Sequence, residues 1–90
     1  MKNVHSNRRS DEQLEALLYE TGHWVVNGNQ GQVLGFAASL GRAIERSAEY
    51  AASGAVVVAI CQLPSDSIIV FPGQIERLRG ILAVREPMAN

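Results

Sequence analysis

The chain has 90 residues, of which 47% are hydrophobic and 19% are charged, and its formal net charge at pH 7 is −1. This length allows one domain, and this composition is typical of a folded protein and not of a disordered one. The nearly neutral charge argues against the broad electrostatic attraction by which basic proteins bind nucleic acid or anionic membranes.

The first nine residues differ in composition from the remainder. They contain Lys2, Arg8 and Arg9 but little apolar surface, so their burial would not offset the entropy lost on ordering them. We expect a disordered tail at residues 1–9, a single domain at residues 10–86, and a short C-terminal tail at residues 87–90.

A short helix is predicted directly after this tail. In "SDEQLEALLYETG", Ser10 and Gln13 have the spacing of a capping box, in which each side chain binds a backbone N–H of the first turn. Leu14, Leu17 and Leu18 follow at helical spacing and predict one apolar face.

The next stretch, "HWVVNGNQGQVLGFA", predicts a β-hairpin. Residues 24–26 and 33–36 are rich in strand formers, and residues 27–31 supply the Asn and Gly that tight turns favour. Gly35 weakens the second strand or marks a close approach of the backbone.

A longer helix is predicted for "SLGRAIERSAEYAASG", with Ser39 as the N-cap and Gly54 beyond the end. Its apolar face consists mostly of alanine, which allows a close approach to a sheet. The face comprises Leu40, Ala43, Ile44, Ser47, Ala48, Ala51 and Ala52.

Two further strands, residues 56–62 and 67–71, are predicted in "AVVVAICQLPSDSIIVF", followed by a helix in "PGQIERLRGILAV" that Pro87 ends. Simple alternation divides the first strand into two apolar faces. One face carries Val56, Val58 and Ile60, and the other carries Val57, Ala59 and Cys61.

The order (α)ββαββα predicts an α+β fold with a four-stranded, mainly antiparallel sheet and helices packed on it. The alanine-rich helix covers one sheet face, but the other is apolar as well. Either the helix at residues 14–18 or a second copy of the chain must cover it. We favour a symmetric homodimer, because large exposed apolar patches mark interfaces.

The run Trp24, Val25 and Val26, within a ββαββ order over residues 23–71, resembles small bacterial domains of uncharacterised function. This resemblance implies the fold and no activity. A single cysteine cannot form an internal disulfide, and with no apolar leader or membrane-length segment we expect a cytoplasmic protein without membrane attachment.

No catalytic cluster, metal site or cofactor is predicted. Two histidines and one cysteine lack the spacing of a zinc motif. Ser65, Asp66 and Ser67 are ordinary turn residues that show no catalytic signature with His23. Cys61 lies in an apolar run, where a cysteine is more often a buried hydrophobe than a reactive thiol.

The leading hypothesis is therefore a non-enzymatic binding or protein-interaction module that forms a homodimer. One alternative is a small-molecule-binding or enzymatic domain with a pocket between sheet and helix, near His23, Trp24 and Tyr50. Another is a nucleic-acid-binding accessory protein. It is less favoured because Arg77 and Arg79 diverge by about 200° around a helix and form no basic stripe.

Overall fold

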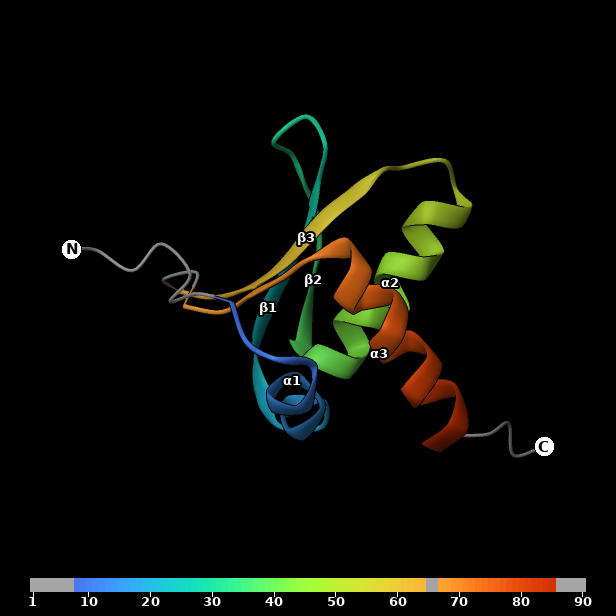
Figure 1. Ribbon diagram of the computed structural model, residues 1–90. Coiled ribbons are helices and arrows are strands. Elements are labelled where there is room, and N and C mark those ends of the chain that lie inside the picture. Colours follow the sequence, from blue (N-terminus) through green and yellow to red (C-terminus); the bar gives the residue numbers. More distant parts are fainter. Residues whose placement is uncertain (1–7, 65–66, 86–90) are drawn as a thin grey trace.

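The computed structural model describes residues 8–64 and 67–85. In this part of the chain, three helices and a four-stranded antiparallel sheet confirm the predicted α+β class (Figure 1). The elements are α1 (Asp11–Leu17), β1 (Thr21–Gly28), β2 (Val33–Ser39), α2 (Leu40–Ala52), β3 (Val57–Gln62), β4 (Ile69–Val70) and α3 (Pro72–Arg85).

The strand order in the sheet is β2-β1-β3-β4, and every neighbouring pair is antiparallel. Since β2 and β3 flank β1, α2 crosses over β1 to connect them. The long strand β2 therefore forms one edge of the sheet, and the two-residue strand β4 forms the other. The first hairpin is longer than predicted, and the fourth strand is shorter.

The predicted helix caps are present. Ser10 and Gln13 form the capping box of α1, and the Ser39 side chain accepts a hydrogen bond from the Arg42 backbone N–H at the start of α2. These side chains pair backbone groups that a first helical turn leaves without partners. Pro87, which we expect to end the last helix, lies outside the described residues.

All three helices contribute to one hydrophobic core on a single face of the sheet (Figure 1). Leu14 of α1 and Leu18, the C-cap residue of this helix, are fully buried in it. The other members are Trp24, Val26, Leu40, Ala43, Ile44, Ile60, Ile68, Val70, Ile75, Leu78 and Leu82. The helix at the N-terminus therefore joins the other helices and does not cover the second sheet face.

A β-bulge in β3 makes the predicted assignment of its side chains to two faces wrong at the start of the strand. Asn27 pairs with Ala59, but the next residue of β1, Gly28, pairs with Val57, so Val58 is the extra residue. As a result Val57 packs against the core, whereas Val58 is 39% exposed and lies outside it. Simple alternation fails there because a bulge shifts the side-chain period by one residue.

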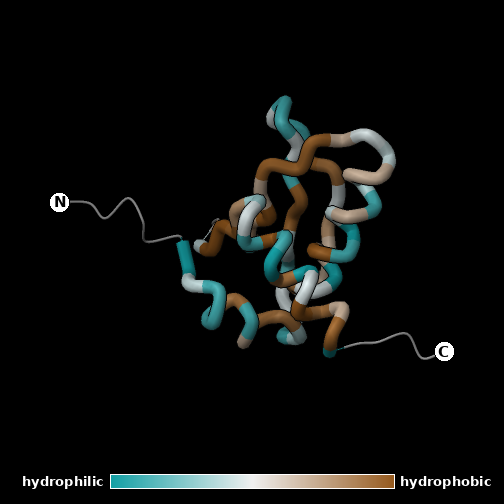
Figure 2. The backbone as a smooth tube through the Cα atoms, turned by 45° about the vertical axis from the view of Figure 1, so that its right-hand side comes forward, coloured by the Kyte–Doolittle hydropathy of each residue, from teal (hydrophilic) through white to brown (hydrophobic). Residues whose placement is uncertain are grey.

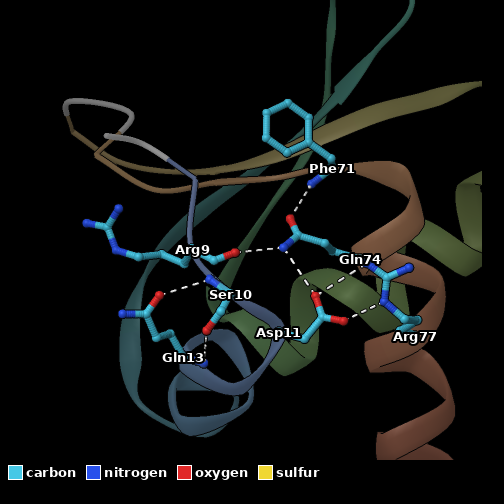
Figure 3. A network of polar contacts seen from close by, with 7 residues as sticks. All are labelled: Arg9, Ser10, Asp11, Gln13, Phe71, Gln74 and Arg77. Carbon is cyan, nitrogen blue, oxygen red and sulfur yellow. Dashed lines mark hydrogen bonds and ion pairs between the residues drawn. The ribbon is translucent and has the colours of Figure 1, made fainter. Parts of the chain in front are cut away.

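A polar network connects the start of α1 to α3 (Figure 3). The buried Gln74 side chain donates from Nε2 to the Arg9 carbonyl at 2.7 Å and to Asp11 Oδ1 at 3.2 Å. Asp11 also pairs with Arg77, whose hydrogen bond lowers the pKa of the Asp11 carboxyl. Because the folded-state pKa is the lower one, this contact stabilises the fold at neutral pH and is lost under acid.

The end of the expected tail also contacts the domain. Arg8 forms a parallel bridge with Ile69 of β4, and its guanidinium lies 4.9 Å from the centroid of the Phe71 ring. For Arg8 and Arg9 the structure thus differs from the expected tail, because the network and the sheet edge give them partners. Residues 1–7 and 86–90 lie outside the described residues.

Gly35 gives a first testable consequence of the packing between β2 and α2. A Cβ at Gly35 would lie 1.9 Å from the Tyr50 hydroxyl oxygen and 2.8 Å from Cζ, so the ring would have to move. We expect Gly35→Ala to lower the free energy of unfolding by about 1–3 kcal/mol. Gly80→Ala in α3, where a Cβ meets nothing within 4 Å, should instead raise it by about 0.5–1 kcal/mol. Urea unfolding of both variants checks this, and equal effects would contradict the close approach.

Candidate interaction surface

The sheet face opposite the helices, called the open face here, carries one apolar row across all four strands. The registers pair Phe36 with Val25, Val25 with Cys61, and Cys61 with Ile69. Paired residues point to the same side of a sheet. Neither Val25 nor Cys61 belongs to the core beneath the helices, so the row lies on the opposite face.

The side chains of this row differ in how much of their surface is exposed to solvent. Val25 and Cys61 on the two inner strands are 5% and 7% exposed, whereas Phe36 on the edge strand β2 is 63% exposed. Val33, which pairs with Asn27 and lies on the same strand as Phe36, is 51% exposed. β2 therefore carries the most exposed side chain of the row, and Val56, directly before β3, and Val58 within it add further exposed apolar surface.

The four strands contain no Asp, Glu, Lys or Arg. Along the backbone the strands are predominantly apolar, and the hydrophilic residues gather in the hairpin turn and on the helices (Figure 2). An uncharged surface loses little hydration free energy when another protein surface covers it. The open face thus has the charge depletion that distinguishes the centre of an interface.

Cys61 is buried, as the sequence predicts. The Asn27 side chain donates from Nδ2 to Sγ at 3.3 Å, which places a polar group beside the thiol on the open face. Access of a reagent to Sγ is restricted by this packing, and the geometry favours a structural role for Cys61 over a reactive one.

A shallow hollow of about 480 Å³ lies at one end of the first hairpin. Its lining is almost entirely apolar and comprises His23, Trp24, Phe36, Ala37, Leu63 and Pro64. His23 is exposed, while the Trp24 side chain is 1% exposed and anchors the core.

The predicted ligand residues are only partly brought together. Tyr50 lies on α2, packed against Gly35, and does not line this hollow. Phe36, which the sequence reasoning did not single out as a site residue, lines the hollow and is the most exposed member of the row. Its place in an alternating strand was the available signal, because Phe36 lies between Gly35 and Ala37, which pair with the core residues Val26 and Trp24.

In residues 8–64 and 67–85, no three His, Cys, Asp or Glu side chains gather as metal ligands would. Within the same residues, no helix has both the length and the apolar content needed to cross a membrane. Comparison of the chain with models of protein families, with curated proteins and with solved structures finds no match.

Proposed function

We propose that this chain is a small non-enzymatic interaction module that forms a symmetric homodimer, with Phe36 at the contact. The observation that carries the proposal is the 63% exposure of the Phe36 side chain on an uncharged strand of the sheet. A large aromatic side chain that is exposed beside other apolar residues is typical of interface centres.

Burial of apolar surface would favour this contact energetically. Covering Phe36 and Val33 removes apolar surface from water, at roughly 25 cal/mol for each Å². Because the surrounding strands carry no charge, little of this gain is lost to the desolvation of ionic groups. The helices, in contrast, carry most of the charged residues and remain in water.

A second copy of the same chain is the occupant that this surface fits best. Two identical charged surfaces would repel each other, whereas two identical uncharged ones meet without an electrostatic penalty. Most soluble oligomers are two-fold symmetric dimers, in which one patch contacts its own copy. One exposed patch on each chain is sufficient for such a dimer.

The substitution Phe36→Asp tests the proposal. In the dimer, two aspartates would lie close to the two-fold axis in place of two aromatic rings, and we expect the variant to be monomeric at concentrations where the unchanged chain is dimeric. Light scattering coupled to size-exclusion chromatography measures the mass, from about 10 µM to about 500 µM because a small interface binds weakly.

Val84→Asp is the matched control. Val84 on α3 is 78% exposed and lies away from the sheet, so the same change in charge there should leave the mass unchanged. Circular dichroism confirms that both variants are folded. A single-chain mass for the unchanged protein over the whole concentration range would refute the homodimer.

The hollow beside His23 supports a second candidate function, the binding of a small apolar ligand. Its volume lies within the range of ligand pockets, and His23 offers one polar group at its rim. Titration with indole, followed by the nuclear magnetic resonance signals of His23 and Leu63, tests it. Saturable shifts confined to these residues would support ligand binding, and unchanged signals would exclude indole-like ligands.

A further inference from the structure

The two edges of the sheet are unequal. On the β4 edge the strand is two residues long, and Arg8 pairs with Ile69 there. On the β2 edge seven consecutive residues, Val33–Ser39, have β1 as their one strand partner among the described residues. One edge is thus covered by the chain itself, and the other presents backbone groups to solvent.

The registers identify which backbone groups of β2 face outward. Leu63 donates its N–H to the His23 carbonyl. The backbone groups of His23 and of every second residue after it in β1 therefore point toward β3. Since bonded and non-bonded pairs alternate in antiparallel sheets, Trp24 and Val26 bond to Ala37 and Gly35 of β2.

The alternate residues of β2, Phe36 and Ala38, therefore direct their N–H and C=O groups away from β1. The same alternation applied to β4 leaves Ile69 facing outward, because Gln62 donates to the Ile68 carbonyl and Ile60 pairs with Val70. Ile69 is the residue that Arg8 bridges, so this derivation agrees with the observed partner at the other edge.

The β2 edge lacks the features by which proteins usually prevent strand addition. It contains no proline and no charged side chain, and its bulge at Leu34 affects one end. Ala38 is exposed and small, so no side chain at that position blocks an approaching strand.

We propose that two copies of the chain pair their β2 strands in antiparallel fashion and form one continuous eight-stranded sheet. This inference rests on the proposed homodimer and specifies its contact. Each outward-facing residue offers one donor and one acceptor, so a two-fold axis matches the strand to its own copy. Phe36 is the midpoint of Val33–Ser39, and the axis brings the two Phe36 side chains together on the joined open face.

Amide hydrogen exchange, measured by nuclear magnetic resonance, tests this pairing on the unchanged chain. The Gly35 and Ala37 amides bond to β1 and should be protected at every concentration. The Phe36 and Ala38 amides should exchange rapidly in the monomer and become at least about tenfold slower in the dimer. Rapid exchange of these two amides at concentrations where the mass is that of a dimer would overturn the edge pairing.

The substitution Ala38→Pro provides a second test. Proline removes an outward N–H and no bond to β1, so the monomer should fold, while the dimer dissociation constant should rise at least about tenfold. The comparison variant is Ala59→Asp, which charges the open face on β3 without touching the edge, because Ala59 pairs with Asn27 there. It should remain dimeric.

The outcomes separate the two proposals. If Ala38→Pro stays dimeric and Ala59→Asp becomes monomeric, the sheets pack face to face: the homodimer stands and the edge pairing is wrong. If the unchanged chain is monomeric at all concentrations, both proposals fail. If Ala38→Pro does not fold, the exchange of the Phe36 and Ala38 amides decides the question.

Discussion

Replacement of Trp24 by alanine is expected to remove about 3–5 kcal/mol from the free energy of unfolding. Trp24 is the largest of the fully buried side chains, with 1% of its surface exposed, and it contacts the core from the central strand β1. A domain of this size has only a modest total stability, so this loss should leave much of the population unfolded at 37 °C. Urea unfolding followed by far-ultraviolet circular dichroism measures it.

Two further variants make this result specific. Trp24→Phe retains most of the apolar volume and should lose less than Trp24→Ala, because the loss grows with the cavity that remains. Val84→Ala removes an apolar side chain that is 78% exposed and should change the stability by no more than about 0.5 kcal/mol. Equal losses for Trp24→Ala and Val84→Ala would show that Trp24 is not the core anchor.

Leu14→Ala should lower the free energy of unfolding by about 2–5 kcal/mol, the usual cost of a buried leucine. Leu14 is fully buried although it belongs to a seven-residue helix, which is too short to be stable in isolation. We expect α1 to depend on this contact, so that the melting temperature falls by at least about 8 °C for a domain of this length.

Ala16→Ser is the control within α1. Ala16 is exposed, and serine in its place should cost about 0.5 kcal/mol through helix propensity alone. A loss below about 1 kcal/mol for Leu14→Ala would mean that α1 is not docked on the core. In that case the assignment of all three helices to one sheet face would have to be abandoned.

The element order and the helix caps could be predicted because each depends on local sequence. Ser10, Gln13 and Ser39 specify helix starts through hydrogen bonds to backbone groups within three residues. The hairpin turn and the strand-forming residues Trp24 to Val26 are equally local signals. Such features remain readable without knowledge of the tertiary structure.

The sheet face on which α1 docks could not be predicted, because leucines at helical spacing fit either face. The docking depends on a contact between distant residues: the Gly41 N–H donates to the Leu18 carbonyl at 2.9 Å. A Cβ at Gly41 would lie 2.9 Å from that same oxygen, so the first turn of α2 approaches α1 this closely only with glycine.

The sequence predicted an apolar surface on the second face of the sheet, but it did not predict which residues are exposed there. An apolar second face followed from the composition of the strands, whereas the prominence of Phe36 depends on strand order. Phe36 is exposed because β2 is an edge strand, and Val25 on the adjacent strand is covered. Tyr50 packs against Gly35 from α2 and does not line the hollow beside His23 and Trp24.

A sheet with only one unpaired edge strand can pair with one further chain and then has no unpaired edge left. The Arg8 bridge to Ile69 occupies the β4 edge, so the pairing of two β2 strands would leave a covered edge at each end of the joined sheet. Chains with two open edges add further copies without limit and give fibres. In the dimer proposed above, the Arg8 bridge would thus limit the joined sheet to two chains.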